Sequence, residues 1–369
     1  MKYGIDLHRP PLLWTILAWA PSQLYRMYQY LRGWLFAHGW RRIHRLKTPV
    51  LSVGNLTVGG TGKTPVTAFL AEYLANKGYR TVIISRGYGG RSVPQREPDA
   101  VKVVSDGQRV LLNAAAAGDE PYLLANKVPG AAVLCHPDRL RAGRWAEEHL
   151  RPDIILLDDG FQHMRLHRDY NLLLMDGRRP LGNGRVLPAG PLREPAVAIR
   201  RADAILLTRC EVSSPPPDLI RRLGLITPDV PVYTSNFRLT TLYAAAQNSD
   251  ISLSRFKGKP VVAFCGIAHP QQFFRMLTAA GLQLRAVLTF DDHQDYSAAE
   301  EQRIVAACNR TGAVAALTTR KDQVKLPAVE LPCPLYGVDM ALHLHQPDWL
   351  TQMESHLHLN GRNGERRGD

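Results

Sequence analysis

Six consecutive residues near the start of the chain, Gly59-Gly60-Thr61-Gly62-Lys63-Thr64, have the types and spacing of a phosphate-binding loop. Glycines let backbone N–H groups approach phosphate oxygens, the lysine reaches the β- and γ-phosphates, and the threonine hydroxyl can bind Mg²⁺. The full G-x-x-x-x-G-K-[ST] pattern would place glycine at position 57, where this chain has Thr57. We predict that ATP binds at eight consecutive residues, which are Thr57, Val58, Gly59, Gly60, Thr61, Gly62, Lys63 and Thr64.

A loop of this kind also needs an acidic residue at the end of a buried strand to hold the metal ion. The stretch IILLDDGFQH supplies two, because its apolar run leads directly to Asp158 and Asp159. Adjacent side chains at a strand end point to opposite faces of the sheet. We expect one carboxylate to bind Mg²⁺, directly or through water, and the other to serve the substrate side or support the metal ligands. A helix cap is the structural alternative.

Two further places hold groups that could move a proton. Asp119 and Glu120 follow a run of small residues, and they are either the first turn of a helix or an acid/base and metal-organising pair. His293 lies beside Asp292 at the end of a predicted strand, and a carboxylate neighbour sets the basicity and orientation of an imidazole. Taken alone, His293 is better explained as a surface histidine.

An arginine-rich stretch, DGRRPLGNGRVLPAGPLREP, runs from Asp176 to Pro195 and contains too much Gly and Pro for a helix or a central strand. Loops of about twenty residues are uncommon in compact domains and are usually functional or disordered. The arginines favour an anionic ligand, and a solvated loop is the alternative; they are Arg178, Arg179, Arg185 and Arg193.

Two tetrapeptides, Thr208-Arg209-Cys210-Glu211 and Thr319-Arg320-Lys321-Asp322, loosely resemble the N-K-x-D guanine reader of GTPases. Neither contains the asparagine, so we interpret both as surface or loop residues. Adenine is then weakly favoured over guanine as the base.

The residues after Pro49 alternate between patterns typical of strands and helices. Val50–Val53 is a predicted strand that leads into the glycine loop, and the apolar stripe that follows predicts a helix ending at Gly78. Further short apolar runs predict buried parallel strands with helical crossovers. These runs are Thr81–Ser85, Ile154–Leu157, Leu172–Met175, Ile205–Leu207, Val261–Phe264, Leu284–Phe290 and Ala315–Thr318.

The predicted fold class is therefore α/β, with a mostly parallel sheet of the P-loop NTPase type flanked by helices, and a smaller second α/β domain. We divide the chain into an N-terminal helical segment (1–47), a kinase core (48–235), a linker (236–258), the smaller domain (259–350) and a disordered tail (351–369).

The N-terminal segment is unusually basic and aromatic. Residues 1–47 contain eight Lys or Arg against one acidic residue, which gives +7 of the chain's net charge of +13, and four of its six tryptophans. The apolar run Pro11–Ala20 is about half the roughly 20 residues needed to span a bilayer. Mixed aromatics, leucines and arginines instead suit a helix in the membrane interface. A signal peptide and a helix packed on its own domain are the alternatives.

The five cysteines lie far apart without a C-x-x-C pair, which indicates reduced thiols in a cytosolic setting and argues against a disulfide framework or a zinc site. The basic segment shows no helix with base-reading residues, so we expect no nucleic-acid partner.

Seven stretches together resemble one family, the tetraacyldisaccharide 4′-kinases of Gram-negative bacteria. They appear in family order between about residues 50 and 325, and the family likewise lacks the first glycine of the loop. They are SVGNLTVGGTGKTP, SRGYGG, GDEP, HPDR, LDDGFQH, LPAGPLREP and FDDHQDY. Each motif is modest alone, whereas seven in order are highly specific.

The resemblance implies an ATP-dependent lipid kinase that phosphorylates the 4′-hydroxyl of tetraacyldisaccharide 1-phosphate, giving lipid IVA at the cytoplasmic face of the inner membrane. It implies that Lys63 and Thr64 hold phosphates and Mg²⁺, and that Glu120, Asp158 and Asp159 organise the metal site. It implies Asp119 as the catalytic base, supported by His293. Residues implied at the lipid disaccharide or its 1-phosphate are Arg86, Arg139, His163 and Arg193.

Gln294 stands where some members of the family have a second histidine, so a role of that position does not carry over. A nucleotide-driven switch that works by dimerisation is the rival interpretation. The signature lysine of such switches would lie two positions before the second glycine, where this chain has Val58. ATP hydrolysis without an acceptor would distinguish a switch from a kinase.

Overall fold

The computed structural model describes residues 6–8, 10–87, 100–244, 249–292, 296–326 and 330–359 of the chain. The chain divides into two compact units, which are described separately below. The smaller unit comprises Phe237–Leu342, and the larger unit comprises Lys2–Asn236 together with His343–Asp369. The chain passes between the units inside two strands, β8 (Val232–Ala244) and β13 (Leu335–Leu344).

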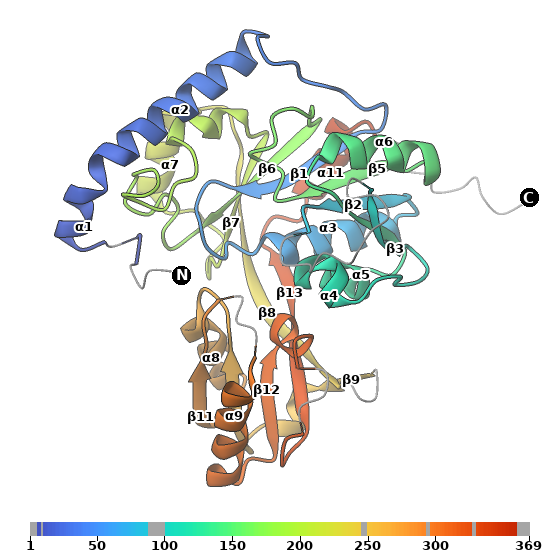
Figure 1. Ribbon diagram of the computed structural model, residues 1–369, viewed down its shortest axis with the longest axis vertical. Helices are drawn as coiled ribbons and strands as arrows, with labels where there is room; N and C mark the ends of the chain where they lie inside the picture. The colour runs from blue at the N-terminus through green and yellow to red at the C-terminus, as the bar shows by residue number, and fades with distance from the viewer. Residues whose placement is uncertain are drawn as a thin grey trace, which may run out of the picture. The chain divides into compact units, whose positions relative to one another are not determined.

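The larger unit is built on a mostly parallel sheet (Figure 1). Its strand order is β7-β6-β1-β5-β2-β4-β3, in which only β3 is antiparallel to its neighbour, and the start of β8 pairs with β7. The bounds are β1 Val50–Asn55, β2 Thr81–Ser85, β3 Lys102–Asp106, β4 Ala131–Cys135, β5 Ile154–Asp158, β6 Tyr170–Asp176 and β7 Ala204–Thr208. The strands predicted from apolar runs are confirmed, because both faces of a parallel sheet are buried and such strands are almost uniformly apolar.

Helices cover this sheet. The predicted helix after the glycine loop is α3 (Lys63–Asn76), which packs on β1, β2 and β5, while α6 (Arg139–His149) packs on β2. The other elements are α4 (Ala114–Ala117), α5 (Asp119–Lys127), η1 (Ala196–Arg201) and α7 (Pro217–Gly224). Between β6 and η1, residues 177–195 form no helix or strand, as their Gly and Pro content predicts.

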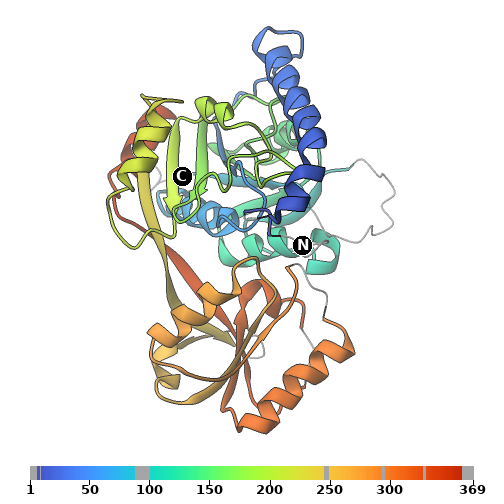
Figure 2. The ribbon, with the colours of Figure 1, turned by 90° about the vertical axis from the view of Figure 1, so that its left-hand side faces the viewer.

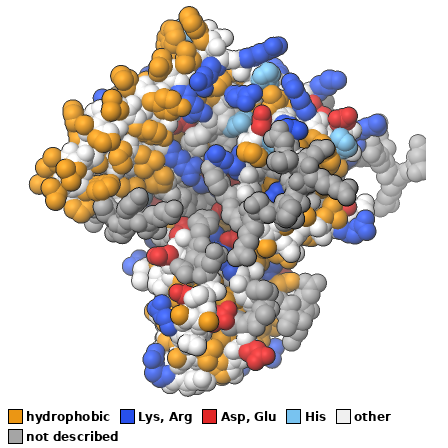
Figure 3. Space-filling model, viewed as in Figure 1, with side chains coloured by type: hydrophobic (Ala, Val, Ile, Leu, Met, Phe, Trp, Pro, Cys, Tyr) orange, Lys and Arg blue, Asp and Glu red, His pale blue; other side chains and the backbone are white. Residues whose placement is uncertain are grey.

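Two helices near the N-terminus, α1 (Leu12–Leu17) and α2 (Trp19–Ala37), form an arm along the outside of the larger unit (Figures 1 and 2). Large apolar side chains on this arm are exposed, and they gather on its surface in Figure 3. They are Leu12, Leu13, Ile16, Leu17, Trp19, Leu24, Met27, Tyr28, Tyr30, Leu31 and Trp34. Among the helices that the structure describes, none is both long and apolar enough to span a bilayer.

The smaller unit is a second α/β layer structure. Its strand order is β11-β10-β12-β13-β8, with β9 (Ser249–Ser252) antiparallel to β8, and apolar clusters fill both sides of the sheet. The bounds are β10 Pro260–Cys265, β11 Gln283–Thr289, β12 Ala315–Thr319, η3 Leu253–Phe256, α8 Pro270–Ala279, α9 Ala298–Thr311 and α10 Arg320–Gln323.

Two predicted boundaries differ from the structure. Most of the segment expected as a linker, 236–258, lies in β8, β9 and η3. Buried and exposed residues alternate irregularly along β8, so its sequence lacks a clear strand pattern. The expected disordered tail, 351–369, begins inside a helix, α11 (Trp349–His356), and residues 343–350 belong to the larger unit instead of the smaller domain. Residues 360–369 lie outside the described part of the chain.

Helix α11 is held by a buried apolar face that the sequence analysis did not single out. Trp349 is fully buried, and its Nε1 donates a hydrogen bond of 2.8 Å to the hydroxyl of Tyr170 on β6. Lys77 at the end of α3 forms a 2.7 Å ion pair with Glu354. The end of the chain is therefore part of the larger unit's core.

We expect Trp349→Ala to lower the free energy of unfolding by about 3–5 kcal/mol, because it leaves a cavity and an unpaired Tyr170 hydroxyl. Thr351→Ala, at an exposed position of the same helix, is the control and is expected to stay within about 0.5 kcal/mol of the wild type. Urea unfolding followed by circular dichroism measures both. Equal stabilities of the two variants would contradict this account of α11.

Candidate active site

Several polar residues, among them the predicted Asp158 and Arg86, lie where the parallel strands of the larger unit end. Asn55, Asp158, Asp176 and Thr208 are the last residues of β1, β5, β6 and β7, and Arg86 directly follows β2. Because parallel strands end at one edge of a sheet, side chains far apart in the sequence meet there. This edge is also where open α/β sheets bind ligands.

The glycine loop, residues 57–64, connects β1 to α3 and places its backbone amides at a helix N-terminus. Gly62 is the N-cap of α3 with φ +86°, and Gly59 has φ +107°. Both values lie in the left-handed region that disfavours residues with a Cβ. Pro65 occupies the first turn of α3, where its missing N–H removes no helical hydrogen bond. The positive end of the helix dipole and its free N–H groups favour a bound anion.

Side chains at the ends of β1 and β7 hold the glycine loop in place. The amide of Asn55 donates to the carbonyl oxygen of Thr57 at 2.8 Å and to the hydroxyl of Thr61 at 2.9 Å. The hydroxyl of Thr208 donates to the carbonyl oxygen of Thr61 at 3.0 Å. The guanidinium of Arg209, also paired with Asp176, donates to the carbonyl oxygen of Gly60. These hydrogen bonds to the loop's carbonyl oxygens fix the shape of its backbone.

The backbone N–H of Val58 donates to the carbonyl oxygen of Pro191 at 2.8 Å, so it is occupied within the protein. Of the eight residues predicted for ATP, those with backbone groups near the helix N-terminus, Gly59 to Thr64, are the better placed for phosphate.

Asp159 lies between two cations. Arg193 donates from one guanidinium nitrogen to both carboxylate oxygens, at 3.0 and 2.9 Å, and the ammonium of Lys63 lies 3.7 Å away. Burial alone would raise the pKa of Asp159, but the charges of Lys63 and Arg193 outweigh it and lower that pKa. Asp159 is therefore an ionised carboxylate near neutral pH.

Asp158 has the opposite environment. It is buried, accepts a 3.1 Å hydrogen bond from the hydroxyl of Thr67, and lies near two other carboxylates. Burial and the negative charges of Glu120 and Asp159 raise the pKa of Asp158 above its usual range. The two adjacent aspartates therefore have different partners. Asp159 has φ +54° and lies beyond the strand, so the alternation of side chains along a strand does not account for the difference.

Oxygen ligands gathered in this way suit Mg²⁺. The metal prefers oxygen, and it usually takes one or two carboxylates together with substrate phosphates and water. Within the described residues no group of three or more His, Cys, Asp or Glu is placed to hold a metal ion by itself. Burial and the neighbouring charges of Glu120 and Asp159 raise the pKa of Asp158, and a bound cation would favour the ionised form of this carboxyl group.

Asp119 and Glu120 form the first turn of α5, directly after Gly118, whose φ is +92°. The interpretation of Asp119 and Glu120 as the first turn of a helix is therefore confirmed. A role as an acid/base or metal-organising pair stays a prediction, and Glu120 is close enough to Asp158 to raise the pKa of that residue. α5 packs against α3, the helix that carries Lys63.

Arg139 and His163 lie close together. Arg139 is the buried first residue of α6, and its guanidinium donates to the carbonyl oxygen of Pro137 at 3.1 Å. Burial and the charge of Arg139 lower the pKa of His163 to about 4, so its ring is neutral at pH 7. The Nε2 atom of His163 is buried, and among the described residues it has no hydrogen-bond partner. Arg86 is exposed, and His293 and Gln294 lie outside the described residues.

Sequence reasoning missed several residues of this site. Thr208 and Arg209 were interpreted as surface or loop residues, whereas both bind the glycine loop, and Thr208 is fully buried. Asn55, Thr67 and Gln162 carried no expected role. A polar residue that ends an apolar strand, such as Asn55 or Thr208, is the signal that could have identified them.

Comparison with known proteins agrees with the motifs. The profile of the LpxK family, tetraacyldisaccharide-1-P 4′-kinase, matches residues 14–358. The chain belongs to this family. It is 45% identical over 318 residues to the tetraacyldisaccharide 4′-kinase of Geobacter metallireducens, with 86% of this chain and 90% of the relative covered. It is 40% identical over 357 residues to that of Syntrophotalea carbinolica, with 95% of each chain covered.

A solved structure is similar over the same extent. The crystal structure of LpxK from Aquifex aeolicus, described as an "apo" form in complex with ATP, has a TM-score of 0.75 and 32% identity, covering 94% of this chain and 100% of that one. Membership of the tetraacyldisaccharide 4′-kinase family confirms the predicted α/β fold and the assignment as a kinase.

We predict that His163 makes stability pH-dependent. Its folded-state pKa of about 4 lies below the ordinary 6.5, so the unfolded chain binds the proton more readily between these values. Stability present above pH 6.5 is therefore lost as the pH falls toward 4, by roughly 1–3 kcal/mol. Urea unfolding from pH 7 to pH 4 should show a shallower decline for His163→Gln than for the wild type. Parallel profiles would contradict the prediction.

Proposed function

We propose that this protein transfers the γ-phosphoryl group of ATP to the 4′-hydroxyl of tetraacyldisaccharide 1-phosphate, forming lipid IVA in lipid A biosynthesis. The observation that carries the proposal is the meeting of Lys63, Asp158, Asp159 and Arg193 beside the glycine loop. The family and its relatives are named for this phosphorylation.

In the proposed step the substrate's 4′-oxygen attacks the γ-phosphorus in line. A P–O bond to the sugar forms, the bond between the γ-phosphorus and the β,γ-bridging oxygen breaks, and ADP leaves. The hydroxyl proton passes to Asp119, the proposed base. Lys63 and the amides at the start of α3 meet the charge that develops on the transferred group. The proposed support of the base by His293 concerns a residue outside the described part of the chain and stays a prediction.

Mg²⁺ is the proposed cofactor, with Thr64, Glu120, Asp158 and Asp159 as the residues that would hold it directly or through water. When bound, the ion neutralises phosphate charge and orients the transferred group. The protein's own part is to keep Asp159 ionised, which the lowered pKa supports.

The proposed anionic acceptor fits the cations at this edge. We assign Arg86, Arg139, His163 and Arg193 to the sugar and its 1-phosphate. The buried Nε2 of His163, which has no hydrogen-bond partner among the described residues, supports a polar ligand beside it. Arg139 lies near that ring and near Asp159.

We further propose that the arm of α1 and α2 rests on the cytoplasmic face of the inner membrane. Its exposed apolar side chains form a surface of the kind that interfacial helices bury, and exposed arginines accompany them (Figure 3). An acceptor with four acyl chains stays in the membrane, so the kinase must work at that surface.

The kinase assignment is tested by transfer of labelled γ-phosphate from ATP to tetraacyldisaccharide 1-phosphate in detergent micelles. We expect Lys63→Ala and Asp119→Asn each to lower kcat/KM at least about 100-fold, because one removes charge stabilisation and the other the base. Glu72→Gln, at an exposed position of α3, is the control and should match the wild type. ATP hydrolysis without lipid, and no transfer, would support the nucleotide switch instead.

For the arm, we expect Leu24→Gln combined with Leu31→Gln to weaken binding to vesicles of phosphatidylethanolamine and phosphatidylglycerol by at least about tenfold, since two exposed leucines lose their transfer energy. Leu111→Gln changes an exposed leucine between β3 and α4, outside the arm, and should bind like the wild type. Cosedimentation measures all three. Unchanged binding of the double variant would reject membrane contact through α2.

A further inference from the structure

Helix α2 turns its polar side inward. Four residues spaced along one face contact carbonyl oxygens of loops in the larger unit: Ser22, Tyr25, Gln29 and Arg32. Residues at such spacing share one side of a helix, while Leu24, Met27 and Leu31 lie exposed on another side. Apolar contacts alone could attach α2 to the larger unit, so we ask what these four directional hydrogen bonds add.

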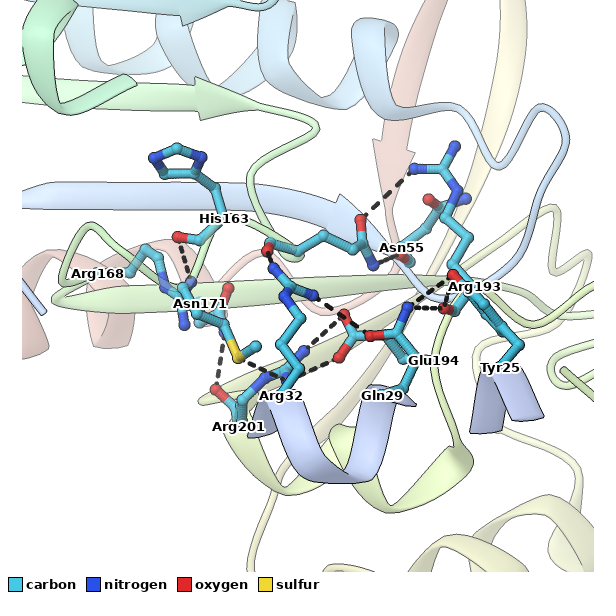
Figure 4. A network of polar contacts seen from close by, with 12 residues as sticks. Tyr25, Gln29, Arg32, Asn55, His163, Arg168, Asn171, Arg193, Glu194 and Arg201 are labelled. Carbon is cyan, nitrogen blue, oxygen red and sulfur yellow. Dashed lines mark hydrogen bonds and ion pairs between the residues drawn. The ribbon is translucent and has the colours of Figure 1, made fainter. Parts of the chain in front are cut away.

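Two of these side chains converge on one atom, the backbone carbonyl oxygen of Arg193 (Figure 4). The hydroxyl of Tyr25 donates to it at 2.8 Å, and the side-chain amide of Gln29 donates at 3.1 Å. The same amide lies 2.6 Å from the Tyr25 hydroxyl, and Gln29 is only 9% exposed. Buried hydrogen bonds are directional, so this pair fixes where the backbone of Arg193 lies relative to α2.

The position of Arg193 determines where two charged groups of the site lie, its own guanidinium and the carboxylate of Asp159. The N–H of Arg193 donates to the carbonyl oxygen of Leu56 at 2.7 Å, and its guanidinium binds Asp159, which faces Lys63. A backbone shift at Arg193 would therefore displace the guanidinium, the carboxylate and the start of the glycine loop together.

A second route runs through Gln162. Arg32 of α2 donates to the carbonyl oxygen of Gln162, whose side-chain amide donates to the carbonyl oxygen of Asn55 at 2.8 Å (Figure 4). The side-chain oxygen of Asn55 accepts a 3.3 Å hydrogen bond from Lys63. Both routes lead from α2 to the same lysine.

We propose that Tyr25 and Gln29 are positioning residues for phosphoryl transfer, which place Arg193 and, through it, Asp159 and Lys63. The inference rests on the roles proposed above for Asp159 and Arg193. The arm then has two separable functions: its outer side contacts lipid, and its inner side orders the site. Small displacements of positioned groups can cost up to about 100-fold in rate.

The test compares Gln29→Met and Tyr25→Phe with a matched substitution on the same helix. Gln23→Met removes the same amide at a position outside this contact network, so it is the control. Five quantities are measured for each full-length variant: kcat, KM for ATP, the folded fraction by circular dichroism, binding to phosphatidylethanolamine–phosphatidylglycerol vesicles, and hydrogen exchange of segments 57–64 and 186–195.

We expect Gln29→Met to lower kcat about tenfold and to speed exchange in both segments, with vesicle binding, folded fraction and KM for ATP within about twofold of the wild type. Tyr25→Phe should act in the same direction, and Gln23→Met should match the wild type. Combined with Arg193→Lys, Gln29→Met should cost less than the product of the single effects, because both changes act through the same guanidinium.

Unchanged kcat, or a loss that follows vesicle binding or the folded fraction, would overturn the positioning role. Fully multiplicative effects with Arg193→Lys would also overturn it. Phosphoryl transfer by the wild type tests the proposed function separately, because a wild type without transfer would contradict that function. Hydrogen exchange does not depend on transfer, so unaltered exchange in Gln29→Met would still reject an effect of α2 on the site loops.

Discussion

The position of Asp159 between Lys63 and Arg193 is the interaction on which the rest of the site depends. Asp158 and Asp159 lie at the end of β5, and burial together with the negative charges of Glu120 and Asp159 raises the pKa of Asp158. The two cations keep Asp159 ionised while its buried neighbour Asp158 has a raised pKa. Adjacent residues of one chemical type thereby acquire different properties, which is how carboxylates in one site take different roles.

Holding that arrangement requires that several loops be fixed at once, and the structure does so by hydrogen bonds between loops. The glycine loop is bound through its carbonyls by Asn55, Thr208 and Arg209, and the segment before η1 is joined to it at Leu56 and Val58. Helix α2 binds that segment from outside. The rigidity of the site therefore comes from parts of the chain that carry no reactive group.

Much of the fold was predictable because local patterns reported it directly. Uniformly apolar runs gave the parallel strands, and Gly59 to Thr64 predicted a loop opening a helix. The predictions differed from the structure where the pattern was weak. In β8 buried and exposed residues alternate irregularly, and α11 is short and followed by a polar stretch, so a strand resembled a linker and a helix resembled a tail.

The sequence by itself determined the chemistry: which residues can hold phosphate, bind a metal or move a proton, and the order of motifs that marks the family. Only the tertiary structure decided which of them meet. Lys63, Asp159 and Arg193 are separated by up to 130 positions, and their distances follow from strand order. The pKa directions, the role of Arg209 and the inner face of α2 depend on burial and on partners from distant segments. No local pattern contains that information, because electrostatic and hydrogen-bond energies depend on separation in space.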